Sequence, residues 1–73
     1  MKFAVEVEAD TAEALDILVS ATEKWFKSVE ATILEREKDE EDCTVVFIVK
    51  SKKDIRWTDS VEDLPGSVAI EPL

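Results

Sequence analysis

The chain begins with an alternation of apolar and polar residues that is typical of a half-buried β-strand. In Lys2–Glu8, the residues Phe3, Val5 and Val7 fall on one face, and three of the four remaining positions are charged. A more apolar stretch, Cys43–Lys50, has six apolar residues among its eight. Because apolar side chains occupy both of its faces, we expect this stretch to be an inner strand of a sheet.

Between these two stretches the spacing of apolar residues changes to that of a helix. Asp10–Lys27 contains no Gly or Pro, and its mainly apolar stripe continues one turn further: Leu15, Leu18, Val19, Thr22, Trp25, Phe26 and Val29. We expect Asp10 to cap this helix, with Glu13 three residues later in the position of a capping box. Acids near the start and lysines near the end also suit the helix dipole.

A hairpin is predicted after the helix. Val29–Glu35 returns to a period near two and indicates a strand in which alternate residues share a face: Val29, Ala31 and Ile33. Arg36–Asp42 is almost entirely charged and indicates a connection to Cys43–Lys50 with an acidic tip. It contains no Asn-Gly or Asp-Gly pair, so the turn type and the register stay open.

The last third of the chain gives a mixed pattern. Ser51–Leu64 reads as a short helix, although the alternation of Ile55 and Trp57 also suits a strand. We favour a short helix that ends before Pro65 and Gly66, because that pair does not continue one. A final strand, Ser67–Glu71, follows, with two residues turned inward: Val68 and Ile70.

The predicted order of elements is strand, helix, strand, strand, short helix, strand, within a single domain that spans residues 1–73. Helices that cover one face of an antiparallel sheet satisfy this order economically. Right-handed crossovers then give an α+β, ferredoxin-like (split β-α-β) sandwich with a four-stranded antiparallel sheet and its first and third strands in the centre.

Acidic residues outnumber basic ones, 18 against 9, which gives a formal net charge of −9. Such a surface repels free nucleic acid, whose binding depends on cationic contacts to phosphate. It favours a protein partner with a basic surface. No segment is apolar over the roughly 20 residues that a membrane span requires, so we expect a cytoplasmic protein that contacts neither membrane nor nucleic acid directly.

Few residues suited to catalysis are present. The chain has no His and no Tyr, which removes the usual proton-transfer groups near neutral pH. Cys43 is the single cysteine, so neither an intramolecular disulfide nor a thiolate metal cluster can form. It follows four acids, whereas a nucleophilic thiolate needs a neighbouring cation. We therefore expect no enzyme activity, no cofactor and no metal.

Two groups of residues are candidates for a partner-binding site. The acidic run at the hairpin tip lacks the alternate ligand spacing and the Gly of a calcium loop, so it is either a solvated turn or a contact for a basic partner. On the face of the sheet away from the helices, a modest apolar patch is either a protein contact or a set of stray aliphatics. Its members are Ala4, Leu34, Val46, Ile48 and Ala69, with a rim of Glu6, Glu8, Glu30 and Glu71. The predicted site residues are Glu6, Glu8, Glu30, Asp39, Glu40, Glu41, Asp42, Val46 and Ile48.

The segment Leu64–Val68, with its Pro-Gly pair before a last strand, resembles the closing segment of small ACT-like regulatory domains, which share the order of elements. In that family the turn that carries ligand binding usually contains Gly, and here the turn is Glu8–Thr11. Heavy-metal-associated domains share the arrangement too, but this turn has no Cys pair. Neither resemblance transfers a ligand site to this chain.

The sequence therefore favours a small acidic, non-catalytic module that binds a basic protein surface. One form is an inhibitor that presents carboxylates where a nucleic-acid-binding enzyme expects phosphates, in the manner of compact phage-encoded anti-defence proteins. The alternative is an ACT-like regulatory or oligomerisation domain, which would form a homodimer through its sheet.

Overall fold

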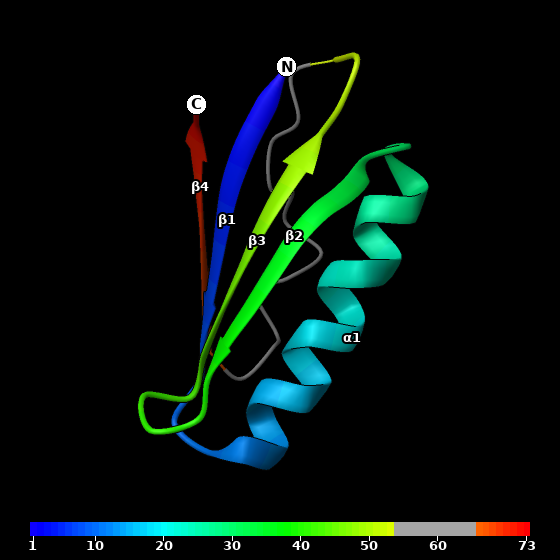
Figure 1. The fold of residues 1–73 in the computed structure, drawn as a ribbon. Helices are drawn as coiled ribbons and strands as arrows, with labels where there is room; N and C mark the ends of the chain where they lie inside the picture. Colours follow the sequence, from blue (N-terminus) through cyan, green and yellow to red (C-terminus); the bar gives the residue numbers. More distant parts are fainter. Residues whose placement is uncertain (54–65) are drawn as a thin grey trace.

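The computed structural model describes residues 1–53 and 66–73, which form one helix and a four-stranded antiparallel sheet (Figure 1). The elements follow one another as β1 Lys2–Glu8, α1 Ala12–Ser28, β2 Thr32–Asp39, β3 Thr44–Lys50 and β4 Ser67–Pro72. The α+β class predicted from the sequence is confirmed. The short helix expected before Pro65 lies outside the described residues.

The strands lie in the order β2-β3-β1-β4, and each neighbouring pair is antiparallel. β1 and β3 are therefore central, as expected from the high apolar content of β3. The helix α1 connects β1 to β2 and lies against one side of the sheet (Figure 1). The other side of the sheet is the one that the predicted binding patch occupies.

The core forms where the apolar side chains on one face of the sheet pack against the apolar stripe of the helix. Alternate residues of β1 and β3 are buried on the helix side: Phe3, Val5, Val7, Val45, Phe47 and Val49. The helix contributes residues from the predicted stripe, among them Leu15, Leu18, Val19 and Phe26. The rings of Phe26 and Phe47 meet edge to face, with centroids 5.3 Å apart and planes at 78°. This contact joins the middle of the sheet to the carboxyl-terminal half of α1.

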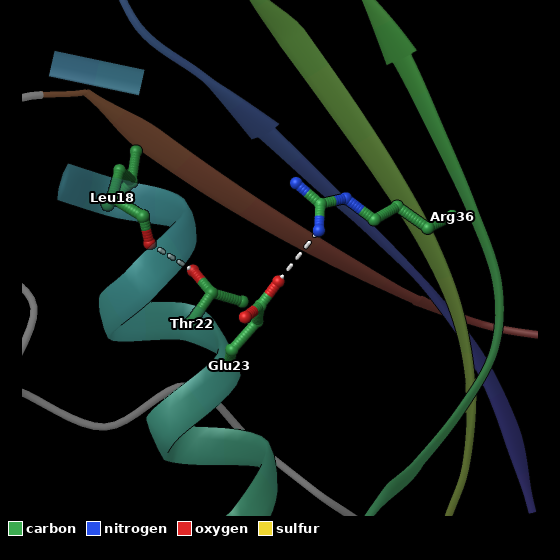
Figure 2. A network of polar contacts seen from close by, with 4 residues as sticks. All are labelled: Leu18, Thr22, Glu23 and Arg36. Carbon is green, nitrogen blue, oxygen red and sulfur yellow. Dashed lines mark hydrogen bonds and ion pairs between the residues drawn. The ribbon is translucent and has the colours of Figure 1, made fainter. Parts of the chain in front are cut away.

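Thr22, a polar residue of the helix stripe, is fully buried, and its hydroxyl has a hydrogen-bond partner. The Thr22 hydroxyl donates to the Leu18 carbonyl oxygen at 2.7 Å, one turn earlier in the helix (Figure 2). Because this hydrogen bond satisfies the hydroxyl, the Thr22 methyl group can pack in the core like an aliphatic side chain.

The helix begins at a different residue from the one predicted. Thr11, and not Asp10, is the N-cap: its backbone is extended at φ −135° and ψ 159°, and its Oγ1 accepts from the Ala14 amide at 3.1 Å. Both residue types cap helices well, and they are adjacent in the sequence. The shift also moves Glu13 out of the capping-box position, because that position is now held by Ala14.

Thr11→Ala is expected to lower the free energy of unfolding by about 1 kcal/mol, because it leaves an amide of the first turn without its acceptor. Chemical denaturation followed by circular dichroism measures this change. Asp10→Ala is the matched control and should cost no more than about 0.5 kcal/mol. The opposite ranking of the two variants would mean that Asp10 is the cap in solution.

The second strand also begins later than predicted, because the chain leaves α1 through a helix-terminating turn. Val29 is the C-cap, and Glu30 adopts a left-handed conformation with φ 58°. The amide of Ala31 donates to the Phe26 carbonyl at 2.8 Å, and that of Glu30 to the Lys27 carbonyl at 3.3 Å. This pair of bonds forms a Schellman motif, which usually has Gly at the left-handed position. The expected strand face of Val29, Ala31 and Ile33 is therefore wrong.

β2 continues through residues that were predicted to be a connection. All eight of its residues, Thr32–Asp39, are exposed, and its register against β3 shifts between Ile33 and Glu35. Arg36 turns toward the helix, where its Nη1 lies 3.0 Å from Glu23 Oε1 (Figure 2). Its guanidinium carbon lies 5.7 Å from the centre of the Phe47 ring. Since both members of this ion pair are well exposed, it orients β2 more than it stabilises the fold.

Candidate functional site

The β2–β3 turn is held in place by Asp39, the last residue of β2, and by Ala9, which follows β1. Asp39 Oδ1 accepts from the amides of Glu41 at 3.1 Å and Asp42 at 3.4 Å. Cys43 closes the turn in a left-handed conformation, φ 49°, and its carbonyl accepts from the Ala9 amide at 3.1 Å. The acidic turn is therefore fixed beside the end of β1 rather than projecting freely from the hairpin.

The side of the sheet opposite α1 is called the open face here. Its members follow from the strand alternation, because neighbouring partners point to the same side. One row across it holds Asp39, Thr44, Glu8 and Ser67; the next holds Glu37, Val46, Glu6 and Ala69; the third holds Glu35, Ile48, Ala4 and Glu71. Beyond the third row lie two lysines, Lys2 and Lys50. The open face thus carries six carboxylates around a half-buried apolar centre.

The acidic end of the open face and the turn together form an open concavity of about 720 Å³. The described residues that line it are Glu6, Glu8, Glu37, Lys38, Asp39, Glu40, Glu41, Asp42, Thr44 and Val46. Seven of these ten carry a carboxylate and one, Lys38, carries a positive charge. The concavity therefore collects negative charge from three separate segments of the chain: β1, β2 and the turn.

These carboxylates are not neutralised within the described part of the chain. The ion pair found there joins Arg36 to Glu23, on the helix side of the sheet. Across residues 1–53 and 66–73, no three His, Cys, Asp or Glu side chains are grouped so as to hold a metal ion. A concentration of fixed negative charge with low-dielectric walls attracts and orients cationic partners. The arrangement is suited to electrostatic recognition.

Seven of the nine predicted site residues line this concavity: Glu6, Glu8, Asp39, Glu40, Glu41, Asp42 and Val46. The patch and the acidic tip, which the sequence presents as two candidates, are thus one continuous surface. Ile48 lies in an adjoining concavity of about 470 Å³ that shares Glu37 and Val46 with the first. The two hollows together follow β3 from the turn toward Lys50.

Glu30 does not belong to this surface. It was expected on the rim of the patch because Val29–Glu35 was predicted to be a strand of the sheet. In the structure it lies in the turn after α1, at the opposite end of β2 from the acidic turn. Glu30 is exposed and acidic, but it is separate from the other eight predicted residues.

Two carboxylates of the open face, Glu35 and Glu37, were predicted neither as site residues nor on the rim of the apolar patch. They were missed because the run from Glu35 to Asp39 was divided between the end of a strand and a connection. The sequence nevertheless contains a signal: the charges from Glu35 to Asp39 alternate between negative and positive. This alternation has the period of two of a β-strand, although it involves charge and not hydrophobicity. It puts the three acids on the open face and turns Arg36 and Lys38 toward the helix side.

Cys43, the single cysteine, is half-buried and packs against the core at the start of β3. Its Sγ lies 4.0 Å from the Glu40 carbonyl oxygen, within the turn. The side chain thus has a packing role there, at the position of a small apolar residue.

Comparisons with known proteins add no family to this description. The sequence matches no protein-family model, and searches of curated proteins and of solved structures gave no significant match. Within residues 1–53 and 66–73, no helix combines the length and the apolar composition that crossing a bilayer requires.

Proposed function

We propose that this chain is a small, non-catalytic module that binds a basic protein surface through the open face and the adjoining acidic turn. The observation that carries the proposal is the concavity lined by seven residues with carboxylates, which come from β1, β2 and the turn. Charge complementarity of this kind accelerates association and selects against acidic partners. The half-buried Val46 and Ile48 supply an apolar centre to such a contact.

The proposal includes a specific form, inhibition by charge mimicry. An enzyme that grips nucleic acid presents cations where phosphates bind, and a dense group of carboxylates competes for them. The ferredoxin-like (split β-α-β) assignment belongs to the same proposal and is supported by the strand order β2-β3-β1-β4. A cytoplasmic location is proposed with it.

The alternative is self-association of two sheets, as in an ACT-like domain. The apolar residues of the open face favour it, since Ala4, Val46 and Ile48 are only half-buried. Against it, two open faces in contact would bring two sets of six carboxylates together, with two lysines each to offset them. Like charges at close quarters disfavour such a contact. Binding of a basic partner is therefore the preferred function.

Affinity capture from an extract of the source cells tests the proposal at about 50 mM and about 200 mM salt, because charge-led complexes weaken steeply with ionic strength. The immobilised wild type is compared with Glu6→Lys/Glu37→Lys, which reverses two charges within the concavity. Asp16→Lys/Glu30→Lys is the matched control, since it changes the net charge equally at exposed residues away from the open face. We expect the wild type and the control variant to retain basic proteins at the lower salt concentration. The Glu6→Lys/Glu37→Lys variant should lose them.

Duplex DNA added to the captured complex should release those proteins, because it competes for the same cations. Capture that is equal for both double variants, or that resists DNA and salt, would contradict the proposal. Light scattering of the pure chain distinguishes the alternative: a dimer that Val46→Glu converts to a folded monomer would favour self-association instead.

A further inference from the structure

The apolar centre of the open face runs along a single strand. Val46 and Ile48 of β3 are half-buried on this side, and they lie in the two adjoining hollows that follow the strand. Carboxylates flank Val46 on both sides: Glu37 of β2 and Glu6 of β1 are its cross-strand partners. Glu35 of β2 is the partner of Ile48. On the β1 side, Ala4 lies opposite Ile48, and the acids Glu6 and Glu8 border only the half nearer the turn. The result is a narrow apolar track with an acidic border along β2 and along part of β1.

The width of this track fits one kind of element. Neighbouring strands are about 4.8 Å apart, so the acids of β2 and β1 form borders about 10 Å apart. An α-helix with its side chains is about 10–12 Å across. A helix laid along β3 therefore places one stripe on Val46 and Ile48 while residues on its two flanks reach Glu37 and Glu6. Two residues along a strand span about 6.6 Å, so the three rows extend over about 13 Å, or between two and three helical turns.

We propose that the open face along β3 binds a basic amphipathic α-helix of the partner, with an apolar stripe on Val46 and Ile48 and Lys or Arg on both flanks. This inference rests on the proposed function, because it specifies the basic surface that the module recognises. A nucleic-acid-reading helix has a comparable form, since it enters a major groove about 12 Å wide between two lines of phosphates. The open face of a second copy does not fit the track, because it is acidic itself.

The test uses two synthetic peptides of about 14 residues and identical Leu and Lys content. In the first, Leu recurs at helical spacing, so that one face is apolar and both flanks are cationic. In the second, the same residues are ordered so that Leu and Lys mix around the helix. Isothermal titration gives the affinities at about 50 mM salt, and amide chemical shifts locate the contact. We expect the amphipathic peptide to bind at least about tenfold more tightly, a difference of about 1.4 kcal/mol, with the largest shifts at Glu37, Val46 and Ile48.

Matched variants locate the site. Ile48→Lys should weaken binding of the amphipathic peptide by about tenfold or more, while Ile17→Lys, the same substitution at a residue of α1 that is 55% exposed, should not. If Ile48→Lys does not fold, Glu37→Lys gives the same readout, because every residue of β2 is exposed. Glu13→Lys of α1 is its control.

Equal affinity for the two peptides would overturn the helix-binding inference and leave charge-led binding standing. Failure of both peptides to bind at low salt would count against the proposed function itself. Binding that Ile17→Lys weakens as much as Ile48→Lys would place the contact elsewhere and overturn the inference.

Discussion

Phe47→Ala is expected to lower the free energy of unfolding by about 3–5 kcal/mol. Phe47 is 0% exposed, lies in the middle of β3, and meets Phe26 edge to face at 5.3 Å. Its removal leaves a cavity where α1 joins the sheet, and it also removes the ring beneath Arg36. A domain of this size has a total stability of roughly 4–11 kcal/mol, so the variant loses a large part of it. Thermal unfolding should show a fall in Tm of more than about 10 °C.

Phe47→Leu serves as the control for this prediction. Leucine keeps most of the apolar volume, so the cost should stay below about 1.5 kcal/mol. If Phe47→Ala unfolded at the wild-type temperature, the central position of β3 in the core would be wrong, and the open face built on its other side would be wrong with it.

Gly66→Ala is expected to destabilise the chain by at least about 1–3 kcal/mol, the usual cost of a backbone conformation reserved for glycine. Gly66 has φ 140°, and an added Cβ would lie 2.3 Å from the Glu8 carbonyl oxygen and 2.7 Å from Leu18 Cδ2. The carbonyl belongs to the backbone of β1 and cannot turn aside. The start of β4 must therefore move away from β1 at the pair formed by Glu8 and Ser67.

Amide hydrogen exchange and thermal unfolding test this expectation together. The amides of Val68 and Ile70 should exchange faster in Gly66→Ala than in the wild type, and Tm should fall. Ser67→Ala, an exposed neighbour, should change stability by no more than about 0.5 kcal/mol. Unchanged exchange and Tm in Gly66→Ala would show that β4 does not approach β1 as closely as described.

The elements that the sequence predicts well are those in which hydrophobicity and period agree. β1 was predicted with its observed bounds, Lys2–Glu8, and the start of β3 was predicted within one residue. In both strands, alternate apolar residues pack on the buried side of the sheet. The stripe of α1 was predicted for the same reason, and five of its seven members are buried: Leu15, Leu18, Val19, Thr22 and Phe26. The central position of β3 followed from apolar residues on both of its faces.

The errors occur where local chemistry permits two solutions. Asp10 and Thr11 are both good caps, and only the path of the chain into α1 selects Thr11. The start of β2 was predicted too early, at Val29 instead of Thr32, because Glu30 takes a left-handed conformation that is usually recognised in a sequence by glycine. β2 was displaced because none of its residues is buried, so its hydrophobic pattern carried no information about its register.

The sequence predicted most residues of the candidate site, but not that they form one continuous surface. Seven of the nine residues lie around one concavity, yet the sequence alone shows no relation between the acidic turn and the open face. Their meeting depends on tertiary contacts, such as the hydrogen bond from Ala9 to Cys43 that holds the turn against β1. Pairings between residues so far apart along the chain are not encoded in any local period.

The alternation of charge along β2 has a consequence for how copies of this chain meet at high concentration. β2 lies at one margin of the sheet formed by the described strands, and its register is interrupted between Ile33 and Glu35. If a second β2 paired with it antiparallel and both helices lay on the same side, acids would oppose acids and cations would oppose cations. Pairing of β2 with a second β2 is therefore disfavoured by the same five residues that supply three carboxylates to the open face.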